Sequence, residues 1–80
     1  MGRTQKKLKT ILPHRKLIGE AIRESRRRVH LTQEQLAERV DLNWKYLGEI
    51  ERGEKIISIE ALLRISASTK VPMSEFFRGL

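Results

Sequence analysis

The chain has 80 residues and carries 17 lysines and arginines against 10 acidic residues, a formal net charge of +7. This length, without an internal repeat, predicts one domain whose small core is shared between its elements. Cysteine is absent and the two histidines are far apart, which excludes a disulfide framework and argues against a metal site. No membrane-length apolar stretch or signal-peptide pattern occurs, so we expect a soluble cytoplasmic protein without a cofactor.

The positive charge is concentrated at the N-terminal end. Residues 1–16 contain six basic side chains and no acid, whereas the remaining 11 basic and 10 acidic residues leave a charge of only +1. Pro13 limits any helix that runs through this segment. We therefore expect residues 1–14 to form a flexible basic arm that attracts polyanions, and residues 15–80 to form the folded domain.

The first two predicted helices follow this arm. Apolar residues recur at helical spacing from about Arg15 to Arg28, which predicts the first helix of the domain. A second helix is expected over residues 33–40. Thr32 and Gln35, three residues apart, have the spacing of a capping box at its start.

A third helix follows after a tight turn. Asp41 tolerates the left-handed backbone that such a turn often needs, and Asn43 is a good N-cap. The helix is expected over residues 44–52, with Leu47 and Ile50 facing inward, until Gly53 offers a C-terminal stop.

Two further helices complete the predicted fold. Ser58 is a fair N-cap for a helix that ends near Ser68, with Ile59, Leu62, Leu63 and Ile65 turned inward or toward a partner. Pro72 marks a break, and a short last helix is expected over residues 74–77. No segment alternates with a period of two, so the predicted fold class is all-α with five helices.

Residues 31–53, together with the first and fourth predicted helices, resemble the Cro/C1-type (Xre-like, lambda-repressor-like) helix-turn-helix family of bacterial and phage regulators. The similarity covers about residues 18–77. The resemblance rests on the capping box, the small Ala37, the aliphatic pair Leu47 and Ile50, and the closing Ile-Glu-Arg-Gly at residues 50–53. Residues 46–54 are also similar to the controller proteins of restriction–modification systems. Asp41 and His30 stand where the family often has glycine, and both cost stability if the backbone is left-handed there.

The resemblance implies a function. It implies a compact regulator, located in a bacterial or phage cytoplasm and nucleoid-associated when bound to DNA, whose third helix enters the major groove. By position, Trp44, Lys45 and Glu49 are the candidates for base contacts. Lys45 would donate to guanine, Glu49 would accept from cytosine and Trp44 would contact a thymine methyl. The alternatives are a solvated Lys45, a Trp44 packed on a neighbouring helix and a Glu49 in a surface salt bridge.

Other side chains are candidates for the DNA backbone. Gln33 lies at the start of the second helix, where amides and dipole favour a phosphate. Gly48 costs roughly 1 kcal/mol relative to alanine in a helix, which close approach to a DNA backbone would justify, although an accidental substitution also explains it. Its role as a helix cap would be enough to explain Asn43. For Arg52 and Lys55 the alternative is a solvated charge on the surface. The backbone candidates are Gln33, Asn43, Gly48, Arg52 and Lys55.

Two further groups of residues have structural roles in this interpretation. Glu51 resembles the family acid that pairs with an arginine of the first helix, which is Arg26 here, and the pair is expected to be structural. Apolar residues near the C-terminus exceed what so small a domain easily hides, so we expect some of them to form a two-fold dimer interface on a palindromic operator. A purely intramolecular core is the alternative. The interface candidates are Leu63, Val71, Met73, Phe76 and Phe77.

A sequence-specific transcriptional regulator is therefore the leading hypothesis. The second is an antitoxin with autoregulatory DNA binding, which needs an extra exposed apolar surface for its toxin partner. An enzyme is not expected, because the sequence has no nucleophile–base pair, catalytic carboxylate pair, phosphate loop or metal cluster. A membrane-surface peptide at residues 1–16 is disfavoured by weak apolar content, and this arm is better suited to phosphate or minor-groove contacts. No small-molecule effector is evident.

Overall fold

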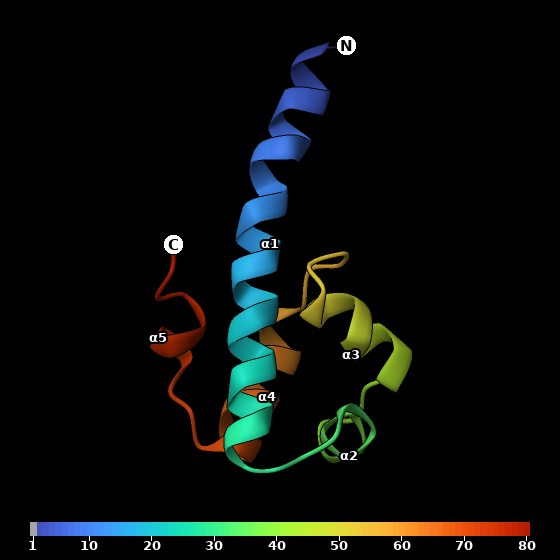
Figure 1. Cartoon of the computed structure of the whole chain (residues 1–80), viewed down its shortest axis with the longest axis vertical. Helices are drawn as coiled ribbons and strands as arrows, with labels where there is room; N and C mark the ends of the chain where they lie inside the picture. Colours follow the sequence, from blue (N-terminus) through green and yellow to red (C-terminus); the bar gives the residue numbers. More distant parts are fainter. Residues whose placement is uncertain (1) are drawn as a thin grey trace.

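The computed structural model describes the backbone of residues 2–80 and the side chains of residues 13–80. The described chain contains five helices and no strand, so the all-α prediction is confirmed (Figure 1). These helices are α1 (Gly2–Arg28), α2 (Gln33–Arg39), α3 (Trp44–Glu51), α4 (Ile59–Thr69) and α5 (Met73–Phe76). No helix in the described part of the chain is both long and apolar enough to cross a membrane.

Helix α1 is longer than the sequence predicted. It has 27 residues and begins at Gly2, not near Arg15, and it contains Pro13 in its interior. Proline removes one backbone donor from the helical ladder, and here the helix continues on both sides of it. The N-terminal half projects beyond the other helices (Figure 1). The side chains of residues 1–12 lie outside the described residues, and the flexibility of the arm stays a prediction.

The local signals at the helix starts act as expected. The Thr32 hydroxyl accepts from the Gln35 N–H at 3.1 Å, and the Gln35 side chain accepts from the Thr32 N–H at 2.9 Å, which completes the capping box. Asn43 Oδ1 accepts from the Lys45 N–H at 2.8 Å. Ser58 caps α4 in the same way, through the N–H of Ala61. These short-range bonds explain why α2, α3 and α4 begin where the sequence predicted.

The connections between helices need left-handed backbone. His30 and Asp41, where the family often has glycine, have φ values of 58° and 56°. Lys70, which the sequence analysis did not single out, has a φ of 58° at the C-cap of α4. Three non-glycine residues therefore occupy a conformation that costs free energy for L-amino acids.

All five helices contribute to one core. Its most buried side chains include Ile22, Leu36, Leu47 and Ile65, each with 0% exposure, and Phe76 with 1%. Leu62 and Ile65 of α4 point inward as predicted, whereas Ile59 and Leu63 are exposed.

The C-terminal apolar residues divide into two sets. Val71 and Phe76 belong to the core of the single chain, so the expectation that they form a dimer interface is corrected. Phe76 of α5 is buried where this helix packs on α1 and α4, and Val71 is buried in the turn before α5. Neither side chain is therefore accessible to a partner. Leu63 and Phe77 remain exposed, and Met73 is half-buried against the core.

Helices α1 and α3 cross in direct backbone contact. A Cβ atom at Gly19 would lie 2.2 Å from the carbonyl oxygen of Ile50 and 2.8 Å from that of Glu51. Real Cβ atoms do not approach oxygen so closely, so a residue without a side chain is required there. This crossing fixes the position of α3 relative to the longest helix of the molecule.

Candidate nucleic-acid interface

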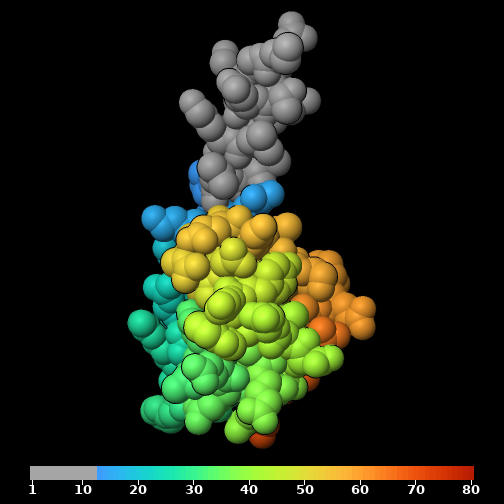
Figure 2. Space-filling view, turned by 90° about the vertical axis from the view of Figure 1, so that its right-hand side faces the viewer, coloured from blue at the N-terminus to red at the C-terminus, as the bar shows by residue number. Residues whose placement is uncertain are grey.

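A shallow hollow of about 380 Å³ runs along the outer face of α3 toward the start of α2. Figure 2 shows this face, with α3 in yellow-green at its centre and the α3–α4 loop above it. Every residue that lines the hollow is one that the sequence analysis assigned to DNA. They are Gln33, Trp44, Lys45, Gly48, Glu49 and Arg52. Asn43 and Lys55 do not line it, although both are exposed.

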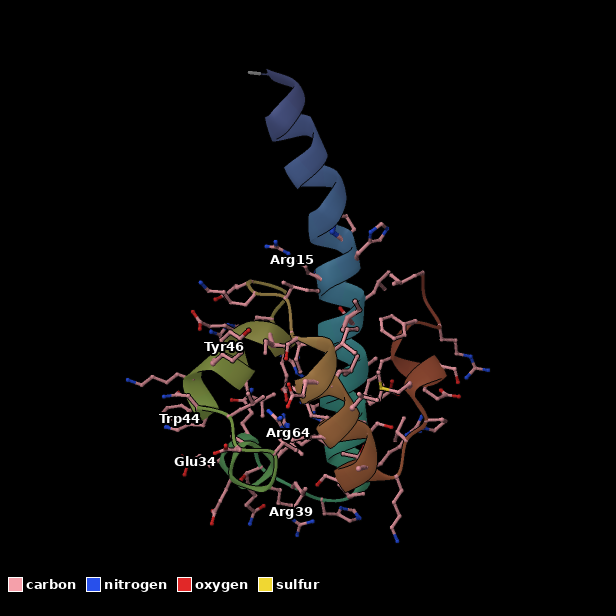
Figure 3. All side chains as sticks on the ribbon, turned by 180° about the vertical axis from the view of Figure 1, so that it is seen from behind. Arg15, Glu34, Arg39, Trp44, Tyr46 and Arg64 are labelled. Carbon is pink, nitrogen blue, oxygen red and sulfur yellow. The ribbon has the colours of Figure 1, made fainter. Side chains whose placement is uncertain are left out.

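Trp44 and Lys45 form the exposed N-terminal end of α3. Trp44 is 48% exposed, and its indole also borders a second hollow with Arg26, Thr32 and Glu34. The Lys45 ammonium lies 5.9 Å from the centre of the indole ring, within cation–π range. Figure 3 shows Trp44 directed away from the core. Trp44 is therefore accessible at the surface, with residues at the start of α2 beside it.

Glu51 is the centre of a buried polar network. Its carboxylate, which is fully buried, accepts from Arg26 Nε at 2.8 Å and from Arg26 Nη2 at 3.0 Å. Arg23 Nε adds a longer contact at 3.4 Å, and Arg26 Nη1 also donates to the carbonyl of Leu31 at 2.9 Å. The network therefore joins α1 to α3 and to the connection before α2.

The charge state of Glu51 follows from these contacts. Burial alone raises the pKa of the Glu51 carboxyl, but the hydrogen bonds from Arg26 and Gln33, with the charge of Arg26 and the contact from Arg23, bring this pKa below its ordinary value. Glu51 is therefore an anion at neutral pH. The sequence analysis proposed the Arg26 partner but missed Arg23, whose spacing of three residues before Arg26 places both on one face of α1.

Gln33 is part of the same network. Its Nε2 donates to Glu51 Oε1 at 3.0 Å, so the side chain is fixed between α2 and α3. The amide nitrogen carries a second hydrogen, which this bond does not use. In the first turn of α2 the Gln35 N–H is capped by Thr32, whereas the backbone N–H groups of Gln33 and Glu34 have no partner within the helix.

Gly48 allows close packing on the surface of α3. A Cβ atom there would lie 3.2 Å from Arg52 Nη1 and 3.3 Å from Gln33 Oε1. Both neighbours are ends of flexible side chains. Packing between α2 and α3 thus gives Gly48 a role in addition to any approach of DNA.

The charged residues at the C-terminal end of α3 differ in their partners. Arg52 is paired with Glu54, through Nε at 2.6 Å and Nη2 at 3.3 Å. This pair holds the pKa of the Glu54 carboxyl below its ordinary value. In the described part of the chain, Glu49 and Lys55 have no ion-pair partner.

Comparison with known proteins identifies the domain. Residues 22–76 match the model of a family described as helix-turn-helix. The chain belongs to the Cro/C1-type helix-turn-helix family. The matched segment runs from the last third of α1 to α5, so it contains the α2–α3 pair and most of the core, but not the N-terminal part of α1.

Several relatives of this family are similar to the chain. The control protein C.MunI of Mycoplasma sp. is 33% identical over 63 residues, which cover 78% of this chain and 85% of that protein. An uncharacterized transcriptional regulator in the ATPase CF(0) region of Rhodospirillum rubrum is also 33% identical over 63 residues. The match covers 79% of this chain but only 58% of the length of that regulator.

Two solved structures share the fold. The restriction–modification controller protein C.AhdI from Aeromonas hydrophila has a TM-score of 0.74 and 30% identity, over 79% of this chain and 96% of that one. The clp gene regulator ClgR from Corynebacterium glutamicum has a TM-score of 0.75 and 30% identity, over 79% of this chain and 67% of that one.

Proposed function

We propose that this chain is a sequence-specific DNA-binding transcriptional regulator, a repressor or controller, that binds a palindromic operator as a dimer. The observation that carries this proposal is the hollow along α3, because each of its lining residues is one that its position in the helix-turn-helix motif directs toward DNA. The similar proteins with known names, a control protein, a controller protein and a gene regulator, support the regulatory part.

In the proposed complex, α3 lies in the major groove with its N-terminal end against the base edges. Lys45 donates to guanine O6 and N7, and the exposed edge of Trp44 contacts a thymine methyl. Glu49 makes no ion pair among the described residues, although its charge acts on the nearby Arg52, and its carboxylate is available to accept from a cytosine amino group.

The backbone contacts fix the register of the complex. Gln33 presents its unused amide hydrogen and the N-terminal amides of α2 to one phosphate. Asn43 and Gly48 face the same strand, while Lys55 reaches the phosphates beyond the C-terminal end of α3. Arg52 joins them when a phosphate displaces Glu54, because a guanidinium binds either anion through the same fork.

The dimer uses the exposed apolar residues Leu63 and Phe77, together with the half-buried Met73. A two-fold axis there repeats the same patch on both partners. The two copies of α3 then lie about 34 Å apart, one turn of DNA, which is why the operator is palindromic. A protein of this kind would work in the cytoplasm, at the nucleoid when bound.

The test is selection of bound duplexes from a random-sequence pool at physiological salt, followed by titration of the selected duplexes. We expect a palindrome that is bound at least ~10³-fold more tightly than random DNA. In the Lys45→Ala variant the preference at one base pair of each half-site should relax, whereas in Lys55→Ala affinity should fall alike for all sequences. No enrichment from the pool would contradict the proposal and direct the search to a protein partner.

A further inference from the structure

Arg15 is a charged residue of α1 that the match to the helix-turn-helix family does not include, since that match begins at residue 22. Its Nε is buried, and no hydrogen-bond acceptor lies within reach of it among the described residues. Buried polar atoms are nearly always paired, so an unpaired guanidinium nitrogen in a half-buried side chain asks for an explanation.

The surroundings of Arg15 place it beside the α3–α4 loop. Gly53 in this loop has a φ of 79°, and a Cβ atom there would lie 2.9 Å from the Cα of Lys16. The loop backbone therefore touches α1 at the residue next to Arg15. On its other side the loop is tied to α3, because the Tyr46 hydroxyl donates to the carbonyl oxygen of Ile56 at 3.0 Å.

This loop carries two of the residues proposed to contact the DNA backbone, Arg52 and Lys55. Figure 3 shows Arg15 extending from α1 on the same side of the molecule as Trp44 and Tyr46, at the level of the loop. Among the described side chains, Arg15, Lys16 and Lys55 have no ion-pair partner. Glu54, an acidic residue of the same loop, is already paired with Arg52. Glu54 also interacts with the charge of Lys55, so the positive charge at this edge is only partly neutralised.

We propose that Arg15 binds a backbone phosphate of the DNA, beyond the phosphates reached by Arg52 and Lys55. This inference rests on the proposed function, since it needs α3 to face DNA. Only the Nε of Arg15 is buried without a partner, and its two terminal nitrogens make no hydrogen bond to the described residues, so this planar fork can bind two oxygens of one phosphate. The contact extends the footprint of the domain past the segment shared with its family.

The experiment compares Arg15→Gln with wild type on two duplexes, the selected operator and a random sequence, over a series of salt concentrations. One phosphate contact contributes about 0.9 to the slope of log affinity against log salt. We expect Arg15→Gln to lower this slope by about that amount, so that the affinity loss between 50 and 200 mM salt becomes roughly three- to fourfold smaller. The ratio between operator and random DNA should not change.

The matched control is Arg39→Gln, which removes the same charge from an exposed arginine at the other end of the described body (Figure 3). A slope change in Arg39→Gln as large as that in Arg15→Gln would show only an effect of net charge and would overturn the inference. Arg15→Lys, which keeps the charge, should retain most of the slope.

Neutral methylphosphonate links, placed one at a time in the operator, locate the contact independently. We expect one flanking position where the neutral link lowers the operator affinity of wild type but not that of Arg15→Gln. Should Arg15→Gln not fold, the comparison uses Arg15→Lys, whose affinity should fall less than that of wild type at this position. The absence of such a position would also overturn the inference. Failure of the proposed function would show differently, as a wild-type protein that binds operator and random DNA equally well.

Discussion

Glu51 illustrates how one residue joins three elements of this domain. The carboxylate is buried and satisfied by two arginines and one glutamine, so its contribution to stability depends on the whole set. Removing one partner of a buried ion pair leaves the other charge without compensation. The residue is therefore a structural part of the domain, although it lies in the helix that is proposed to face DNA.

In Glu51→Gln we expect the free energy of unfolding to fall by about 3 kcal/mol, because Arg26 loses its counter-charge while burial persists. For a domain of this size that lowers the melting temperature by about 12–24 °C. Glu60→Gln, at an exposed carboxylate of α4, is the control and should melt like wild type. A Glu51→Gln protein that melts at the wild-type temperature would contradict the structural role.

The lowered pKa of Glu51 also predicts a pH dependence. A carboxyl whose pKa is lower in the folded protein than in the unfolded chain stabilises the fold above the unfolded pKa, and this stabilisation is lost as pH falls through the folded pKa. Wild type should therefore lose stability below about pH 4.5. Glu51→Gln should show a flatter acid limb in urea unfolding, and parallel limbs would show that other groups dominate.

Backbone strain predicts a gain in stability at a second residue. Lys70 has a left-handed conformation at the C-cap of α4, a position that favours glycine. Lys70→Gly should therefore raise the free energy of unfolding by about 0.5–1 kcal/mol. Asp41→Gly should gain less, since aspartate tolerates this conformation better than lysine. Urea unfolding measures both, and a loss of stability in Lys70→Gly would be evidence against strain at this cap.

At the scale of elements, the contact between α2 and α3 positions the candidate interface. Gln33 bonds to Glu51 across the pair, and Gly48 leaves room for Gln33 and Arg52 on the surface of α3. The hollow depends on the absence of a side chain at residue 48. Adding a single methyl group there therefore tests helix stability and the proposed contact with DNA separately.

Gly48→Ala should be as stable as wild type or more stable, by up to about 1 kcal/mol, because alanine favours the helix and the side-chain ends near it can move. Its DNA affinity should fall, because Gln33 and Arg52 are displaced. Thermal melting and a titration with the operator measure the two effects. In contrast, Gly19→Ala should not fold, since its methyl meets backbone oxygens. Unchanged DNA affinity in Gly48→Ala would exclude this role for the hollow.

The helices also show what could be predicted from the sequence. Caps at Thr32, Asn43 and Ser58 are short-range features, and α2, α3 and α4 begin directly after them. The predicted start of α1 is wrong, because proline usually ends a helix whereas α1 continues through Pro13. The crossing at Gly19 depends on residues more than 30 positions away, and no local pattern indicates it.

The candidate site shows the same division. The position of each residue in the motif was sufficient to predict which side chains of α3 lie together, since the helical period determines which of them share a face. Arg15 was predicted only to begin the first helix of the domain, because no local pattern shows that the fold brings this end of the helix beside the α3–α4 loop. Val71 and Phe76 are apolar like Leu63 and Phe77, so composition alone did not separate the core from the surface.

At the scale of the whole molecule, the proposed dimer needs an exposed apolar surface, and Leu63 is 52% exposed on α4. Leu63→Glu should give a folded monomer, because a charge opposite its own copy across a two-fold axis is repelled. Sedimentation at micromolar concentration measures the oligomeric state. Leu17→Glu, at a partly exposed leucine of α1, is the control and should remain dimeric. A wild-type protein that sediments as a monomer would favour the purely intramolecular core.

The contact between α1 and α3 at Gly19 sets the orientation of α3 independently of its outward side chains. The direction of α3 is set by main-chain oxygens of Ile50 and Glu51 resting on a residue without a side chain, and none of these atoms belongs to the outward residues of α3. If the proposed complex is right, substitutions at Trp44, Lys45 or Glu49 should change which bases are preferred without changing the orientation of α3. In the proposed complex, related proteins would then change their operators one side chain at a time, while the backbone contact at Gly19 keeps the orientation of α3 constant.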